Sequence, residues 1–135
     1  MNNEPLPDID DVIAVADFRS ALRMFMRQTE RVARRSGLTP QRYLLLLMIK
    51  GAPDRSEQST VTELAHRLQL AQSTVTELVN RAEESGLVSR LQSGSDARVA
   101  HLRLTAEGER RLRLSFTGLE TERQRLADAV AHLRQ

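Results

Sequence analysis

Two short predicted helices followed at once by a predicted β-hairpin constrain the fold of this chain more than any other feature. Thr60 and Glu63 have the spacing of a capping box, in which the two side chains satisfy free amides at a helix start. A short link, 69–71, leads to a second helix over about 72–85, and Gly86 closes it because glycine readily adopts the left-handed backbone of a helix end. Two helices joined by so brief a turn predict a helix-turn-helix motif.

The hairpin follows directly after this motif. Residues 87–91 and 99–104 alternate between apolar and polar side chains, which is the pattern of strands that bury one face. The segment between them, 92–97, is rich in Gly, Ser and Asp, which are residue types of tight turns. The sequence therefore predicts a two-stranded wing beside the helix-turn-helix.

Helical stretches flank this region on both sides. Residues of about 10–35 are predicted to form one long helix that Gly37 ends. Thr39-Pro40 begins a second helix, in which the run from Tyr43 to Ile49 is apolar on all sides. After the hairpin, Thr105 caps a last helix that is expected to run to the end of the chain. The fold class is therefore mainly α, an α+β winged helix-turn-helix with a two-stranded wing and long N- and C-terminal dimerisation helices.

The flanking helices carry apolar stripes that exceed what one small winged domain can cover, which predicts a homodimer. The candidate interface residues recur at helical spacing: Phe18, Leu22, Phe25, Leu112, Phe116 and Leu119. We expect a single domain over 1–135, with dimerisation helices at 10–36 and 105–135 and a DNA-binding lobe at 38–104.

Composition excludes several function classes. Cysteine is absent, and the three histidines share no ligand spacing, so neither thiol chemistry nor a metal site is expected. No serine, histidine and acid pattern, glycine-rich phosphate loop or carboxylate pair suggests catalysis, so we expect no enzyme and no cofactor. No apolar run spans a membrane and the acidic start is unlike a signal peptide, so a cytoplasmic protein is expected.

The net charge of +2 is unevenly distributed: residues 1–17 hold five acids and no base, whereas 18–50 hold eight bases and one acid. Nineteen of the 20 basic residues are arginine, which suits phosphate and minor-groove contacts. This arginine content gives weak support for a nucleic-acid partner.

The second helix of the motif has a polar side opposite its apolar side. Its outward residues are the candidate base-reading and phosphate-contacting set: Gln72, Ser73, Thr76, Glu77, Asn80 and Arg81. Short polar groups of this kind fit close to base edges in the major groove of duplex DNA. The alternative is an ordinary solvated helix face. The wing favours DNA, because Arg98 can reach a minor groove and Asp96 can support the turn or hold the arginine.

The chain resembles the MarR (multiple antibiotic resistance regulator) family from about Leu38 to Gly108. The resemblance is carried by TVTELAHRLQLAQSTVTELVNRAEESGLV and by DARVAHLRLTAEG, which fits the family pattern through Asp96, Arg98, Leu102, Leu104, Thr105 and Gly108. It implies a dimer paired by its terminal helices, on a palindromic operator in double-stranded DNA. Residues 72–85 would read the major groove and Arg98 would enter the minor groove. It also implies a repressor that a small phenolic or lipophilic effector releases.

Some residues depart from the family pattern. Ala71 stands where a capping side chain is common, Glu77 where many members place an arginine, and Asn80 where an aspartate is common. The chain also ends about where members commonly continue into a further dimerising helix. Glu77 and the neutral sum of charges over 71–104 leave a second interpretation open, a winged-helix protein-interaction module that does not bind DNA.

Overall fold

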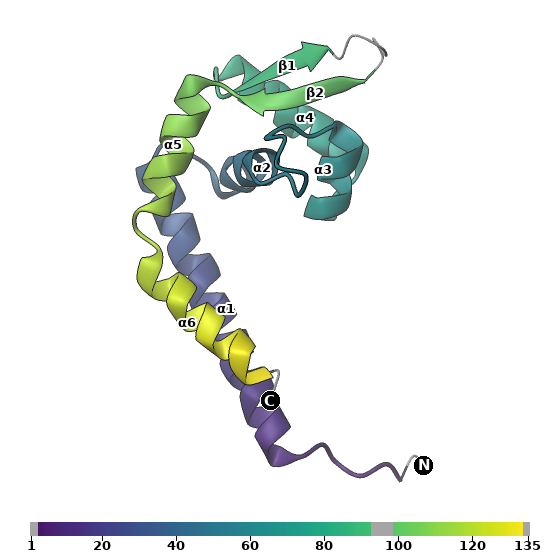
Figure 1. The fold of residues 1–135 in the computed structure, drawn as a ribbon, viewed down its shortest axis with the longest axis vertical. Coiled ribbons are helices and arrows are strands. Elements are labelled where there is room, and N and C mark those ends of the chain that lie inside the picture. Colours follow the sequence, from purple (N-terminus) through teal and green to yellow (C-terminus); the bar gives the residue numbers. More distant parts are fainter. Residues whose placement is uncertain (1–2, 93–98, 134–135) are drawn as a thin grey trace.

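The computed structural model describes residues 3–92 and 99–133. Its helices and strands, in chain order, are α1 (Ile9–Arg35), α2 (Pro40–Lys50), α3 (Val61–Leu68), α4 (Gln72–Glu84), β1 (Val88–Gln92), β2 (Ala100–Leu104), α5 (Ala106–Phe116) and α6 (Glu120–Leu133). Figure 1 shows a lobe made of α2, α3, α4 and the two strands, and a stalk in which α6 lies along α1. Helix α5 connects the lobe to the stalk. The mainly helical fold class predicted from the sequence is confirmed.

Side-chain caps begin three of the helices where the sequence predicts them. The hydroxyl of Thr39 accepts from the Arg42 amide at 3.2 Å, and that of Thr105 accepts from the Gly108 amide at 3.1 Å. At α3 both halves of the capping box form, since Thr60 accepts from the Glu63 amide at 3.2 Å and the Glu63 carboxylate accepts from the Thr60 amide at 2.9 Å. Each cap satisfies an amide that the helix itself leaves without a partner, which fixes where these helices start.

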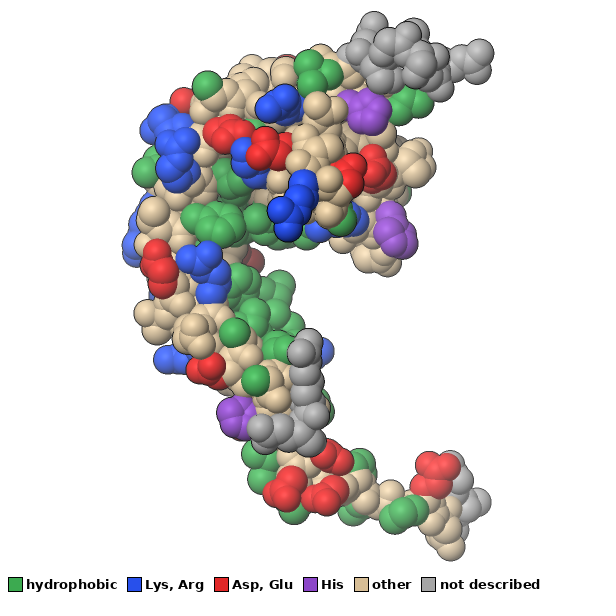
Figure 2. Space-filling model, viewed as in Figure 1, with side chains coloured by type: hydrophobic (Ala, Val, Ile, Leu, Met, Phe, Trp, Pro, Cys, Tyr) green, Lys and Arg blue, Asp and Glu red, His purple; other side chains and the backbone are tan. Residues whose placement is uncertain are grey.

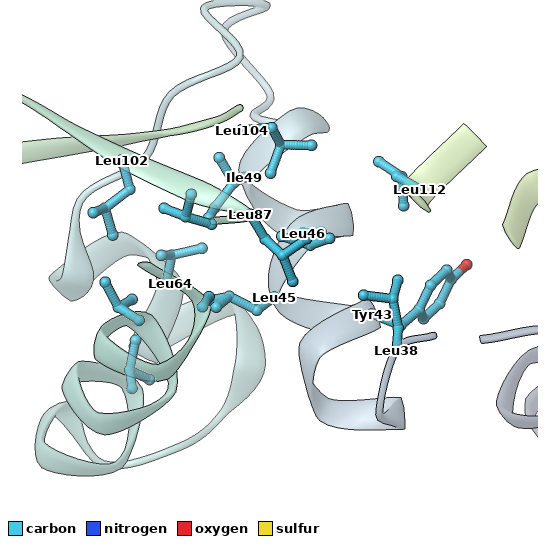
Figure 3. Packing of buried hydrophobic residues seen from close by; sticks show 14 of the residues in the cluster. Leu38, Tyr43, Leu45, Leu46, Ile49, Leu64, Leu87, Leu102, Leu104 and Leu112 are labelled. Carbon is cyan, nitrogen blue, oxygen red and sulfur yellow. The ribbon is translucent and has the colours of Figure 1, made fainter. Parts of the chain in front are cut away.

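The hydrophobic core is centred on α2. Leu45, Leu46 and Ile49 have no exposed surface, and α2 contacts α1, α3, α4, α5 and β2. Figure 3 shows Leu64 and Leu102 at one end of this cluster and Tyr43 with its neighbours at the other. The lobe and the upper part of the stalk therefore share one core.

The wing is an antiparallel pair in which Val88 faces Leu104 and Gln92 faces Ala100. A bridge to Ser59 extends the pairing, because the amide of Ser59 donates to the Leu102 carbonyl at 3.1 Å and the amide of Leu102 donates back at 2.8 Å. The wing is thereby attached to the loop before α3 as well as to the helix-turn-helix.

The expected single helix after Thr105 is wrong: the segment is divided into α5 and α6 by a turn at 117–119. A Cβ at Gly118 would lie 3.2 Å from a Val32 methyl of α1, so this position allows the chain to approach α1 closely. Leu119 is 2% exposed and fills the turn. The break changes the direction of the chain so that α6 continues down the stalk alongside α1 (Figure 1).

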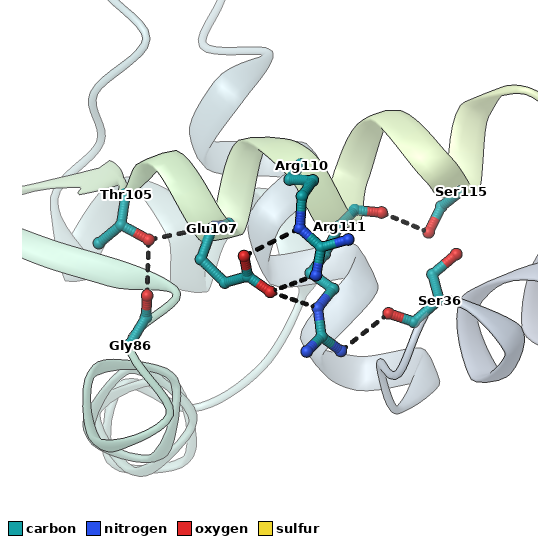
Figure 4. Close-up of polar contacts among 8 residues, drawn as sticks. Ser36, Gly86, Thr105, Glu107, Arg110, Arg111 and Ser115 are labelled. Atoms are coloured by element: carbon teal, nitrogen blue, oxygen red, sulfur yellow. Dashed lines mark hydrogen bonds and ion pairs between the residues drawn. The ribbon is translucent and has the colours of Figure 1, made fainter.

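A polar cluster at the start of α5 joins the lobe to the stalk (Figure 4). Arg111 donates to the Ser36 carbonyl at the end of α1 at 3.0 Å, and its Nε donates to the Glu107 carboxylate at 2.7 Å. Arg110 donates to both oxygens of the same carboxylate, at 2.9 and 2.6 Å. The hydrogen bonds from Arg110 and then Arg111 lower the pKa of Glu107 to about 2. The charged form of Glu107 is thus the form that the folded chain favours.

Replacing Glu107 by Gln should remove a stabilisation that depends on pH. Because folding lowers the pKa of this carboxyl from 4.5 to about 2, the stabilisation is complete above pH 4.5 and is lost as pH falls toward 2. Urea denaturation should show wild type more stable than Glu107→Gln near neutral pH, and the difference should shrink steadily below pH 4.5.

Glu120→Gln is the matched control, since Glu120 faces Arg123 at 4.0 Å on an exposed part of α6. Its effect on the free energy of unfolding should be small at every pH. A Glu107→Gln difference that is constant with pH would show that this cluster does not hold its carboxylate in the charged form.

Candidate nucleic-acid interface

Helix α4 is held in place by its apolar side. Val75, Val79 and Ala82 are completely buried, as their spacing in the sequence predicts. The link from α3 turns sharply at Gln69, whose φ of 56° is left-handed, and the Leu70 amide donates to the Ala65 carbonyl at 3.1 Å. The short turn and the buried side together fix which side of α4 faces solvent.

The outward side of α4 presents the residues that the sequence singled out. Ser73, Thr76 and Asn80 follow one another along this side at intervals of three and four residues, and all three are exposed. Gln72 is exposed at the start of the helix and its Nε2 lies 3.4 Å from the Thr62 hydroxyl of α3. Ala71 makes no side-chain cap, so the first amides of α4 are not satisfied by a preceding side chain.

The two charged members of this set pair with each other. Arg81 Nη2 lies 2.8 Å from Glu77 Oε1, one helical turn away, and both side chains are more than half exposed. An exposed pair of this kind contributes little to stability. Its consequence is electrostatic, because the carboxylate offsets the positive charge of Arg81 on the outward side of α4.

Arg90 links the wing to α4 and is not among the residues predicted from the sequence. Its Nε donates to Glu83 at 2.6 Å and its Nη2 donates to the Asn80 side-chain oxygen at 2.8 Å. Arg90 stands opposite the buried Leu102 in the strand register, so it lies on the face of the sheet that packs against the lobe. The alternation of the strand could have indicated this face, but the partners on α4 depend on the tertiary fold.

The base of the wing is held by a second ionic cluster. Lys50 Nζ lies 2.7 Å from Glu109 and 3.0 Å from Glu57, and Arg103 of β2 lies 3.7 Å from the other oxygen of Glu57. The hydrogen bond to Glu109, followed by that to Glu57, raises the pKa of Lys50. The predicted wing residues Asp96 and Arg98 lie outside the described residues.

The structure corrects part of the expected dimer interface. Leu112 is 5% exposed and belongs to the core of the lobe, and Leu119 is 2% exposed beneath the turn between α5 and α6. Both side chains therefore pack within one chain. Phe18, Leu22 and Phe25 of α1 are half-buried. Phe116 is 37% exposed, with the Arg123 guanidinium 5.0 Å from its ring centre.

Large apolar side chains are exposed along the stalk instead. Those on or just before the first turns of α1 are Leu6, Ile9, Val12, Ile13 and Val15, and further ones along the stalk include Met24, Leu114 and Leu133. Acidic residues accompany them at the start of α1, and Figure 2 shows red and green side chains grouped at that end of the stalk. These exposed apolar residues are not among the six interface residues predicted from the sequence.

An apolar crevice of about 110 Å³ lies between α1 and α2. Its lining residues are Phe25, Met26, Thr29, Glu30, Pro40, Tyr43, Leu44 and Leu47. Figure 2 shows hydrophobic side chains on the concave side of the molecule, where the stalk meets the lobe. Burial raises the pKa of the Tyr43 hydroxyl, so this hydroxyl stays protonated at neutral pH.

Across residues 3–92 and 99–133, no group of three or more His, Asp or Glu side chains is arranged to hold a metal ion. Glu63 is engaged in the capping box. None of the helices in these ranges combines the length and apolar content needed to cross a bilayer.

Comparisons with known proteins give a family and a fold. Residues 36–99 match the sequence model of the MarR family. A MarR mutant from E. coli in complex with operator DNA superposes with a TM-score of 0.68 at 22% identity, covering 86% of this chain and 84% of that one. An S. aureus MepR mutant bound to an oligodeoxyribonucleotide gives 0.66 at 19% identity, with 82% and 79% covered.

Transcriptional regulator Tm0710 from Thermotoga maritima superposes with a TM-score of 0.62 at 25% identity, covering 86% of this chain and 87% of that one. No curated protein matches the sequence. Residues 36–99 are thus similar in sequence to the MarR family, and the chain shares along most of its length the winged-helix fold of solved MarR structures.

Proposed function

We propose that this protein is a transcription regulator that binds duplex DNA as a homodimer, with α4 in the major groove. One observation carries the proposal: the exposed side of α4 consists of short polar side chains, Ser73, Thr76 and Asn80, on a helix whose opposite side is fully buried. A rigid helix with short outward groups can approach base edges closely. The relatives in complex with DNA support this use of the same fold.

Selection from fragmented genomic DNA tests the proposal. The purified protein should retain a small set of fragments that share a palindromic sequence, and binding should weaken as salt rises because phosphate contacts release counterions. Retention of no fragment, or equal retention of all, would favour the protein-interaction module instead.

Replacing Glu77 by Gln should tighten DNA binding. The change removes a negative charge from the outward side of α4 and releases Arg81, which lies 2.8 Å from it, to contact phosphate. One added phosphate contact should steepen the dependence of log affinity on log salt by about 1. Electrophoretic mobility shifts at two salt concentrations measure both effects.

Glu120→Gln is the control, because it removes the same charge from a similar exposed pair on α6, in the stalk. It should leave DNA affinity almost unchanged. If Glu77→Gln instead weakens binding only to sites that contain a particular cytosine, the carboxylate accepts a hydrogen bond from that base and does not act through general repulsion.

The apolar surface of the stalk supports the homodimer. Isolated exposed apolar residues are common, but Ile9, Val12 and Ile13 are 67%, 45% and 51% exposed and share one side of the first turns of α1. A contiguous surface of this kind is usually covered by a partner. The two-fold pairing would bring two copies of α4 to one duplex.

Light scattering at micromolar concentration should therefore give twice the chain mass of 15.2 kDa. Ile13→Glu should shift the population toward monomer, because it places a charge in the apolar surface. Leu91→Glu, a similar change at a 38% exposed position of the wing, should leave the mass unchanged. A wild-type monomer at this concentration would contradict the homodimer.

We further propose that the protein is a repressor whose DNA affinity a small lipophilic or phenolic effector lowers. The apolar crevice between α1 and α2 supports this, because it lies where the stalk meets the lobe and Leu44, at its edge, is 41% exposed. A ligand that fits one arrangement of stalk and lobe better would shift the population toward that arrangement.

A screen of phenolic compounds should find at least one that raises the melting temperature of the wild type and weakens DNA binding. Leu47→Trp, which adds volume at the crevice lining, should abolish the temperature shift. A screen in which no compound changes either quantity, or an equal shift in the variant, would contradict an effector site here.

A further inference from the structure

We propose that Arg90 determines base preference without being a base-reading residue itself, by orienting Asn80 so that this side chain presents hydrogen-bond donors to DNA. The inference rests on the proposed DNA binding. It goes further by naming the chemical group that α4 presents to DNA at position 80. It is carried by the link between β1 and α4, where Arg90 Nη2 donates to Asn80 Oδ1 at 2.8 Å.

The chemistry of the two side chains fixes the direction of this hydrogen bond. A guanidinium has donors and no acceptor, so it can pair with the oxygen of an asparagine amide but not with its nitrogen. Asn80 Oδ1 must therefore face Arg90, and the Nδ2 group must point to the other side. Among the described residues, no acceptor is hydrogen-bonded to Asn80 Nδ2, so its two N–H groups are available to a ligand.

Arg90 is itself held in place, which makes the orientation of Asn80 persistent. Its Nε donates to Glu83 at 2.6 Å, and the Arg90 and Glu83 side chains are only 38% and 30% exposed. The guanidinium thus bridges two residues of α4 that are three positions apart. A planar group with two anchored nitrogens has little freedom to rotate.

Asn80 lies on the side of α4 that the proposed function directs to the major groove. It is exposed and follows Ser73 and Thr76 along the same side of the helix. An asparagine that reads adenine uses both its oxygen, toward N6, and its nitrogen, toward N7. Because Oδ1 faces Arg90 and the Nδ2 group points to the other side, this bidentate pair is lost, and guanine, which presents only acceptors at O6 and N7, becomes the favoured base.

The preference for guanine opposite Asn80 thus depends on Arg90 and Asn80 together. Without Arg90 the amide can rotate and offer its oxygen, so adenine should become the better partner. Aspartate at position 80 would bind Arg90 at least as well, because the hydrogen bond would become an ion pair, but it would have no donor for guanine. If the contact between Arg90 and Asn80 only stabilises the fold, losing Arg90 or changing Asn80 to Asp should alter stability without a specific change in base preference. If the contact positions the amide, both changes should alter base preference, and the change to Asp should do so without loss of stability.

Selection from a randomised duplex library, followed by sequencing, tests the inference on the full-length protein. Wild type should favour guanine over adenine at one position of each half-site. Arg90→Leu should reduce that ratio on the order of tenfold, with little change at other positions. Asn80→Asp should also remove the guanine preference while melting at the wild-type temperature or above.

Arg103→Leu is the matched control, since Arg103 is an exposed arginine on the neighbouring strand whose ion-pair partner, Glu57, lies in the loop before α3. It should lower affinity through charge alone and leave base preference unchanged. Arg90→Leu and Arg103→Leu variants that lose affinity equally, with wild-type base preference in both, would overturn the role of Arg90. A wild type that selects no sequence at all would instead overturn the proposed DNA binding.

Discussion

Helix α2 carries an uninterrupted apolar run from Tyr43 to Ile49, and a helix that is apolar on all sides has to be enclosed by its neighbours. The fold encloses most of this helix: α1, α3, α4, α5 and β2 all contact α2, and although Leu44 is 41% exposed at the crevice, Leu45, Leu46 and Ile49 have no exposed surface. Each such side chain stabilises the folded state by about 1.5–3 kcal/mol. The position of α4, and therefore of its polar side, follows from this enclosure.

The sequence predicts the parts of the fold that local interactions determine. The threonine caps at residues 39, 60 and 105 depend on contacts within four residues of the chain, and each forms where it was expected. Gly37 and Gly86 likewise take φ values of 78° and 75°, as helix ends require. The inward and outward sides of α4 were predictable as well, because helical periodicity alone separates Val75 and Val79 from Ser73 and Thr76.

The parts that could not be predicted depend on contacts between distant segments. Residues 117–119 carry no proline, and the apolar stripe of the sequence continues through them, which favoured one helix although Gly118 is a local signal for a helix end. The break is explained by the close approach of Gly118 to Val32, and this also buries Leu119 within the chain. The role of Arg90 was hidden for the same reason, since its partners Asn80 and Glu83 belong to another element.

The proposed function requires that two copies of α4 reach one duplex together. The stalk would set their separation, and the cluster around Arg111 attaches the lobe to the stalk through the Ser36 carbonyl. Hydroxyl-radical footprinting on a selected fragment tests this geometry directly. Two protected segments are expected on one face of the duplex, with centres about 10–10.5 base pairs or a multiple of that apart. A single protected segment, or protection without two-fold symmetry, would contradict it.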